Sequence, residues 1–331
     1  MIGPLRLVRL RGSARGGWST LRWMYSLGGW LREYYGQFDA VIVAGLRQEA
    51  YVALGAARKS GATTILVAEE DDLPWQQTAT LGARIASRCR EARTIVAPTD
   101  DIAQALIRAG FSGECVTVIP RTVAIPPVCS ASARDAARAA LAAANYDLVT
   151  ANNAQVALAV GRLDAAHRFG DLVRAWRIVT ARRAEARLWI AGDGPDREAL
   201  YRQIGDLDQR FRALLPGTFD CLDELLQASD MLLLPAAHAS PPQSLLQAQA
   251  CGLPVIAADG PAVRAHIEHE QSGLIYPPGD IKSLADAVCA LVERPGTAIA
   301  YGSAARAAAQ ARRTPKDEAQ SYIDLIHRQR R

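Results

Sequence analysis

The chain alternates short apolar segments with helical ones, and this alternation constrains its fold more than any other feature. Helical segments separate apolar runs at 39–45, 63–72, 94–98 and 116–120 in the first half, and at 156–161, 187–194, 231–236, 254–259 and 273–280 in the second. Short continuous apolar runs are typical of strands that are buried on both faces of a parallel sheet. We therefore predict an α/β fold in which helices cover both faces of parallel sheets.

The alternation is interrupted once, and the interruption predicts two domains. Pro126 and Pro127 end the first series, and an alanine-rich stretch at 131–144 follows. Alanine is the best helix former, so this stretch is predicted to be helical. We predict a basic arm (1–37), an N-terminal Rossmann-like domain (38–127), a helical linker (128–154), a C-terminal Rossmann-like domain (155–300) and a helical tail (301–331).

Composition excludes several classes of protein. Of the 331 residues, 50% are hydrophobic and 22% charged, which is typical of a soluble globular chain, and the net charge of +4 does not indicate a nucleic-acid partner. The six cysteines are scattered without a C-x-x-C pair, which disfavours a zinc site and fits a reducing compartment. No apolar run is long enough to span a bilayer, and the N-terminus lacks the apolar core of a signal peptide. We expect a cytoplasmic protein without a bound metal.

Positive charge is concentrated in the first 37 residues. Glu33 is the only acid there, and the arginines are Arg6, Arg9, Arg11, Arg15, Arg22 and Arg32. Trp18, Trp23, Trp30 and Leu27 are interleaved with them. Such a segment either forms a terminal arm or lies on an anionic membrane surface, which would make the protein peripheral to the inner face of the membrane.

The segment 233–259 predicts a phosphate site. It contains a strand, a loop, a helix that begins near Ser244 and a second strand. A helix N-terminus between parallel strands binds phosphate because its free N–H groups and its dipole point at the anion. The amides of Ser244 and Leu245 are the candidates, whereas Pro241 and Pro242 have no N–H to offer.

Two further strand ends carry candidate ligand-binding residues. Arg162 follows Gly161 at the end of a strand, and His167 and Arg168 lie on the same loop, so that two cations can clamp a pyrophosphate. Alternatively, Arg162 forms a salt bridge with a neighbouring helix. The other candidates are glycines that permit close backbone approach to a ligand, namely Gly192 and Gly194 after the next strand and Gly217 at a later turn.

Taken in order, these segments resemble the retaining, nucleotide-sugar-dependent glycosyltransferases of family 4, which have the GT-B fold. The resemblance spans about 156–293 and rests on the ordered set GRL, AGDGP, LLQASDMLLLPA, SLLQAQACGLPVIAADG and SGLIYPPGD. The first half is similar to the acceptor-side domain of these enzymes, shortened at its N-terminal end. The dinucleotide fingerprint G-x-G-x-x-G is absent from both halves, which argues against a nicotinamide-dependent oxidoreductase.

The resemblance implies two Rossmann-like domains that face each other across a cleft, with the nucleotide diphosphate held by the C-terminal one. Arg162 and His167, with Arg168, would stabilise the leaving diphosphate. The implied partners are a nucleotide sugar, which is the co-substrate in place of a cofactor, and a glycan or lipid acceptor. The donor would contact Gly161, Gly192, Gly194, Gly217, Ser244, Leu245 and Gln247.

Several residues depart from the pattern of the family. Members usually have two glutamates eight residues apart, where this chain has Ala239 and Gln247, and a lysine where it has His167. Glu69 and Glu70 replace the usual acceptor-side histidine, and they either contact acceptor hydroxyls or form a solvated loop. Two functions therefore remain open. The protein is an active sugar transferase, or it is an inactive homologue that binds or scaffolds in polysaccharide biosynthesis.

Overall fold

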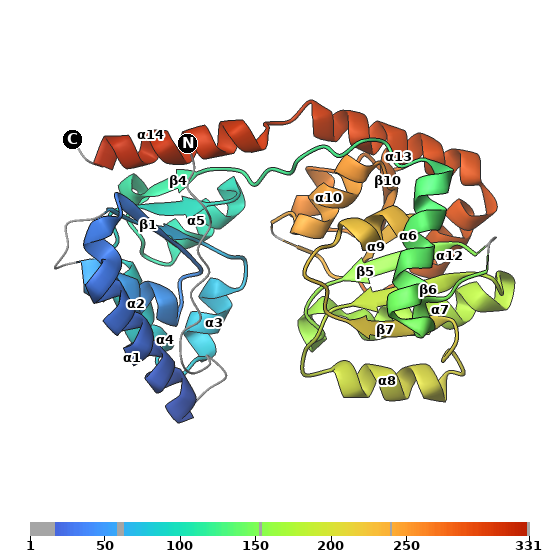
Figure 1. The fold of residues 1–331 in the computed structure, drawn as a ribbon, viewed down its shortest axis with the longest axis horizontal. Helices are drawn as coiled ribbons and strands as arrows, with labels where there is room; N and C mark the ends of the chain where they lie inside the picture. The colour runs from blue at the N-terminus through green and yellow to red at the C-terminus, as the bar shows by residue number, and fades with distance from the viewer. Residues whose placement is uncertain (1–16, 58–62, 152–153, 239, 330–331) are drawn as a thin grey trace. The chain divides into compact units, whose positions relative to one another are not determined.

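The computed structural model describes residues 17–57, 63–151, 154–238 and 240–329 (Figure 1). The chain divides into two compact units. Unit 1 comprises Met1–Arg121 and Lys316–Arg331, and unit 2 comprises Thr122–Pro315. Both units are α/β, as the alternation of the sequence predicts.

Unit 1 is built on a parallel sheet whose described strands pair in the order β1-β2-β3-β4. These strands are β1 (Ala40–Ala44), β2 (Thr63–Val67), β3 (Ile95–Ala97) and β4 (Val116–Val118). The helices that precede or connect them are α1 (Gly17–Tyr34), α2 (Gln48–Ala57), α3 (Asp72–Thr78), α4 (Gly82–Cys89) and α5 (Asp100–Arg108). The second predicted strand, 63–72, is shorter than expected because α3 begins at Asp72.

The end of the chain returns to unit 1. The segment 301–331, predicted to be one helical tail, is divided between α13 (Pro295–Gln310), which belongs to unit 2, and α14 (Pro315–Gln329). Leu325 of α14 is buried in one cluster with Ile65 of β2 and Val96 of β3. The apolar side of α14 therefore completes the core of a sheet that precedes it by about two hundred residues in sequence.

Unit 2 is built on a second parallel sheet, whose described strands pair in the order β10-β9-β8-β5-β6-β7. The strands are β5 (Val156–Val160), β6 (Arg187–Ala191), β7 (Ala213–Gly217), β8 (Met231–Leu234), β9 (Val255–Ala258) and β10 (Gly273–Tyr276). From β5 the chain adds β6 and β7 on one side and then crosses to add β8, β9 and β10 on the other. The carboxyl ends of β5 and β8 are therefore neighbours at a topological switch point, where open α/β sheets bind ligands.

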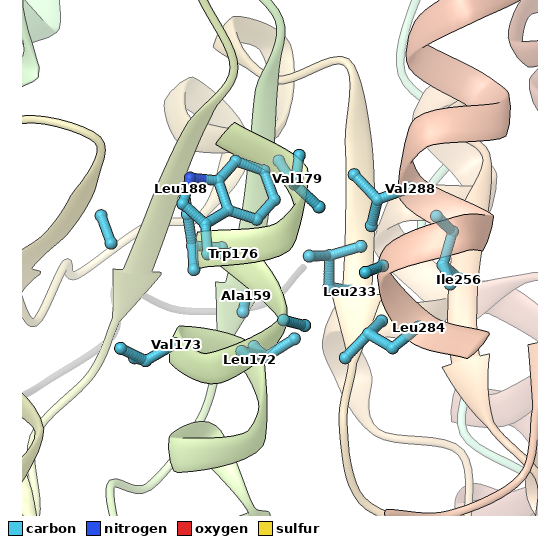
Figure 2. Close-up of a cluster of buried hydrophobic side chains, with 14 of the residues drawn as sticks. Ala159, Leu172, Val173, Trp176, Val179, Leu188, Leu233, Ile256, Leu284 and Val288 are labelled. Atoms are coloured by element: carbon cyan, nitrogen blue, oxygen red, sulfur yellow. The ribbon is translucent and has the colours of Figure 1, made fainter. Parts of the chain in front are cut away.

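Apolar side chains cover both faces of this sheet. Figure 2 shows Trp176 and Val179 of α7 (Phe169–Arg182) near Leu284 and Val288 of α12 (Ile281–Glu293), against strand residues such as Leu233. These side chains belong to one buried cluster. A second cluster covers the other face and draws on α6 (Ala131–Ala144), α9 (Asp223–Ala228) and α10 (Gln243–Cys251). The remaining helices of unit 2 are α8 (Arg197–Asp206) and α11 (Pro261–Arg264).

The predicted helical linker, 128–154, is part of unit 2. Leu141 of α6 is buried with residues of α9 and α10. Arg138 donates to the carbonyl of Ala228 at 2.9 Å and to the carboxylate of Asp230 at 2.7 Å. Sequence composition predicts the helix, but these contacts decide that it packs on the second domain.

Within the described residues, no helix combines the length and the hydropathy needed to cross a membrane. The predicted basic arm, 1–37, falls partly outside those residues. Its described part forms α1 and a short 3-10 turn at Tyr35–Gln37.

Candidate functional site

The candidate site lies at the carboxyl edge of the unit 2 sheet, around the switch point between β5 and β8. Loops after β5, β6, β8 and β9 meet there, and each is anchored by backbone contacts. The amide of Leu163, after β5, donates to the carbonyl of Asp193, after β6, at 3.0 Å. The amide of Ala262, after β9, donates to the carbonyl of His238, after β8, at 3.2 Å. The site therefore rests on a framework of main-chain hydrogen bonds.

The glycines predicted to face a ligand serve chiefly to bring these loops together. Gly192 has a φ of +146°, and a Cβ at this position would overlap the carbonyl oxygen of Gly161. A Cβ on Gly194 would overlap the carbonyl oxygen of Leu163. Gly217 has a φ of +95°, and its carbonyl accepts the Gly192 amide at 2.7 Å. Gly192 and Gly194 are required because backbone meets backbone without room for a side chain, and Gly217 is favoured by its positive φ.

Asp164 joins the predicted cations of the β5 loop. Its carboxylate lies 3.2 Å from Nε of Arg162 and 2.7 Å from Nδ1 of His167. It also caps the short turn at 165–167 by accepting the His167 amide. Partial burial would raise the pKa of Asp164, but the hydrogen bonds and charge of His167, together with the charge of Arg162, outweigh it and hold the pKa below its ordinary value.

Arg162 remains open to solvent in spite of this ion pair. Its side chain is 65% exposed, so the guanidinium keeps donor groups for a ligand. The alternative prediction was a salt bridge to a neighbouring helix. The partner in the structure is Asp164 of its own loop.

Arg168 is committed to a different carboxylate. It adopts the left-handed conformation, with a φ of 56°, immediately before α7. Its Nε donates to Asp171 at 2.8 Å, and the buried Asp171 also pairs with Arg174. The structure therefore joins Arg162 and His167 through Asp164, and it pairs Arg168 with the first turn of α7.

The predicted phosphate amides lie at the start of α10, after the N-cap residue Pro242. The Leu245 amide already donates to the Pro242 carbonyl at 3.0 Å, so it is engaged within the helix. The amides of Gln243 and Ser244 precede this first intrahelical hydrogen bond and are the ones available by position. Gln247, one turn further, has a buried Oε1 for which the described residues provide no hydrogen-bond partner. Ala239 lies outside the described residues.

The predicted acceptor-side acids follow β2 in unit 1. Glu69 forms an ion pair with Arg121, and Glu70 is half-buried. The neighbouring Asp72 is fully buried and accepts the amides of Leu46 and Glu69, each at 2.8 Å. Burial raises the pKa of Asp72 above its ordinary value, although these hydrogen bonds oppose the shift. Part of the acidic cluster therefore fixes the loop rather than offering free carboxylates.

Sequence comparison places the second unit among known glycosyltransferases. Residues 154–294 match the family of glycosyl transferases group 1. N-acetyl-alpha-D-glucosaminyl L-malate synthase of Bacillus anthracis is 33% identical over 127 residues, which are 38% of this chain and 33% of that enzyme. Lipopolysaccharide core biosynthesis glycosyltransferase LpsD of Rhizobium meliloti is 28% identical over 238 residues, 71% of this chain and 64% of the relative. The matched segments thus span less than two thirds of these relatives.

Solved structures extend the likeness to most of the chain. Anabaena Alr3699/HepE, solved with UDP and glucose, has a TM-score of 0.75 at 18% identity and matches 91% of this chain and 81% of that one. Sucrose-phosphate synthase from Thermosynechococcus elongatus has a TM-score of 0.72 at 17% identity, over 93% and 77% of the two chains. The fold and the relatives together define a glycosyltransferase-like protein with the GT-B fold. Residues 154–294 are similar to the family of glycosyl transferases group 1. The predicted fold is confirmed, and the family match over 154–294 agrees with the predicted resemblance.

We expect Gly192→Ala to disrupt the site. The new Cβ would collide with the Gly161 carbonyl and would strain a positive-φ position, which should destabilise the protein by roughly 3 kcal/mol. Urea-induced unfolding measures this loss. Gly296→Ala is the control, because Gly296 lies in α13 with no atom near the added Cβ, and its effect should stay within about 1 kcal/mol. Equal midpoints for the two variants would contradict the close approach of the loops.

Proposed function

We propose that this protein transfers a sugar from a nucleotide-diphosphate donor to a glycan or lipid acceptor, with retention of anomeric configuration, in polysaccharide biosynthesis. The observation that carries the proposal is the group formed by Arg162, Asp164 and His167 at the switch point of the unit 2 sheet. The proposal is also supported by Anabaena Alr3699/HepE, which has a similar fold and was solved with UDP and glucose. Solvent-exposed guanidinium is well suited to a diphosphate, because its planar donors match phosphate oxygens.

In this proposal, charge stabilisation provides most of the catalysis. The bond between the sugar's anomeric carbon and the diphosphate oxygen breaks, and both bonding electrons go to the diphosphate. Arg162 and His167 would bind the charge that develops there, while Asp164 holds both side chains in place. The acceptor hydroxyl forms the new bond on the face from which the diphosphate leaves, and its proton passes to the leaving diphosphate.

The remaining donor contacts are proposed at α10. The buried Oε1 of Gln247 needs a hydrogen-bond donor, and a ribose hydroxyl can supply one. The Ser244 amide would contact a phosphate, whereas Leu245 would contribute apolar packing because its amide is engaged. Gly161, Gly192, Gly194 and Gly217 would shape the loops. On the acceptor side we propose that Glu70 and Glu69 contact acceptor hydroxyls. The charge of Glu69 is shared with Arg121.

A second function has its own support. The chain has no carboxylate at 239 or 247, Pro241 and Pro242 remove two amides from the loop, and Arg168 is paired with Asp171. A protein with these features can bind a nucleotide sugar and still turn it over poorly. The alternative proposal is therefore an inactive homologue that binds or scaffolds in polysaccharide biosynthesis.

Donor binding tests what the two functions share. We expect calorimetry to detect binding of at least one of four donors, namely UDP-glucose, UDP-N-acetylglucosamine, GDP-mannose and ADP-glucose. Arg162→Ala should weaken the binding about tenfold to a hundredfold, because a charge-assisted hydrogen bond is lost. Arg183→Ala is the control, since Arg183 follows α7 and pairs with Glu293 at 2.7 Å. Equal affinities for the two variants would place the diphosphate elsewhere.

Turnover separates the two functions. We expect slow release of nucleoside diphosphate from the bound donor by the wild type. The double variant Ala239→Glu, Gln247→Glu should raise this rate about a hundredfold, because it restores preorganised charge. Gln227→Glu adds a carboxylate at an exposed position of α9 and should leave the rate unchanged. Binding without turnover in the wild type, with turnover in the double variant, would favour the inactive homologue.

We also propose that α1 contacts an anionic membrane surface, where a lipid acceptor would lie. Trp18 and Tyr25 on this helix are 88% and 78% exposed, and Leu21 lies between them in sequence. The spacing of three to four residues puts these side chains on one side of the helix. Arg22 and the arginines of residues 1–16 provide complementary charge for anionic lipid.

Vesicle co-sedimentation tests this contact. Binding should require phosphatidylserine in phosphatidylcholine vesicles and should fall as salt rises. Trp18→Ala with Tyr25→Ala should weaken it at least about tenfold, since two aromatic side chains lose their burial in the interface. Tyr201→Ala, which alters an exposed tyrosine of α8, is the control. Binding to phosphatidylcholine alone, unaffected by either variant, would contradict the proposal.

A further inference from the structure

Two histidines from different loops lie next to each other at the switch point. His167 follows β5 and His238 follows β8, and their ring centroids are 6.1 Å apart with an interplanar angle of 51°. The chain has five histidines, so the meeting of two at the edge that the fold reserves for ligands requires an explanation.

His167 is held in a defined orientation. Its Nδ1 lies 2.7 Å from Asp164, and its ring stacks on Phe169 with centroids 6.2 Å apart. Because Nδ1 bonds the carboxylate, Nε2 is the nitrogen that can face a ligand.

His238 is held through its backbone. Its carbonyl accepts the Ala262 amide at 3.2 Å, and a Cβ on Gly260 would lie 3.3 Å from its amide nitrogen. The loop after β9 therefore fixes the position from which the His238 side chain extends. The ring itself is half-buried beside His167.

The charged groups around the pair are largely neutralised by one another. Asp164 faces His167 and also binds Arg162. Asp259, after β9, is paired with Arg264 of α11, with Nε and oxygen 2.7 Å apart. Arg168, immediately before α7, is bound by Asp171. Two protonated imidazoles at this distance repel each other unless an anion lies against both, so the pair itself favours a doubly charged ligand.

We propose that His167 and His238 together form a proton-dependent binding site for the diphosphate of the donor, in which His238 is a second, previously unassigned cation. The inference rests on the proposed function, because the diphosphate is that of the nucleotide sugar. Nε2 of protonated His167 and a ring N–H of protonated His238 donate to phosphate oxygens. Donor affinity is then set by pH, which a site with only arginine and lysine would not show.

The direction of the effect follows from linkage. An imidazole titrates near about pH 6.5, and an anion that binds its protonated form raises its pKa. Affinity must therefore rise as the pH falls from about 8 to about 5.5, by at most about tenfold per pH unit for each proton taken up. Both phosphates of a nucleotide sugar are diesters and stay fully ionised over this range, so the change reports the protein.

Calorimetry at about pH 5.5 and about pH 8 tests the site, with the four nucleotide sugars named above and inorganic pyrophosphate as probes. His238→Gln should weaken binding about tenfold at the lower pH and hardly at all at the higher one. His327→Gln is the matched control, because His327 is an exposed histidine of α14 in the other unit. Pyrophosphate itself titrates in this range, so its affinities for the variants and the wild type are compared at the same pH, where the charge of the probe is equal.

His167→Lys provides the converse test. Lysine stays cationic through the whole range, so this variant should bind more tightly than the wild type at about pH 8, and the pH dependence that remains should be that of His238 alone. Imidazole nitrogen shifts measured by NMR should move for two of the five histidines when pyrophosphate is added, and they also report folding of each variant. Loss of binding in EDTA would overturn the proposal, because the rings would then act as neutral metal ligands.

The outcomes separate this inference from the function on which it rests. Binding of a nucleotide sugar that depends on Arg162 but neither on pH nor on His238 would overturn the histidine site alone. Pyrophosphate binding that depends on both histidines, without binding of any nucleotide sugar, would support the site and overturn the proposed donor. Failure of every probe at both pH values would overturn both.

Discussion

The reversal of strand order beside β5 is the constraint on which the rest of unit 2 depends. β6 and β7 lie on one side of β5, and the chain then returns to place β8 on the other side of β5. Two loops that are far apart in sequence therefore begin at neighbouring strand ends. The loop after β5 brings Arg162 and His167, and the loop after β8 brings His238 and leads into α10. Because the strands are buried on both faces by α7 with α12 and by α9 with α10, this edge is held rigidly.

Backbone contacts and one carboxylate shape the candidate site at this edge. Gly192 and Gly194 let the loop after β6 lie against the loop after β5, which fixes the main chain from which Arg162 extends. Asp164 then orients two cationic side chains at once. Asp171 does the opposite for Arg168, since it draws that guanidinium into an ion pair with α7. The neighbouring carboxylates, Asp164 and Asp171, therefore decide which of these cations can contact a ligand.

Much of this could be predicted from the sequence. Nine of the ten described strands follow from short apolar runs, whereas β7 was not predicted. The start of α10 follows from the Pro-Pro pair before a helical segment. The position of Arg162 at a strand end could also be predicted from the sequence. Other features were not, because they depend on contacts between distant segments. The packing of α14 on the first sheet, the attachment of α6 to unit 2 and the meeting of His167 with His238 have no signal in local periodicity.

The sequence by itself determined the class of fold, the resemblance to a family and the kinds of residue at the candidate site, because burial pattern and the order of motifs are local properties of the chain. Tertiary structure alone decided what those residues can do. Gly192 and Gly194 admit a neighbouring backbone, the Leu245 amide is used by its own helix, and Glu69 is paired with Arg121. The physical reason is that a charge or an N–H group can bind a ligand only if no protein group already pairs with it. Only the folded chain brings such partners within hydrogen-bonding distance.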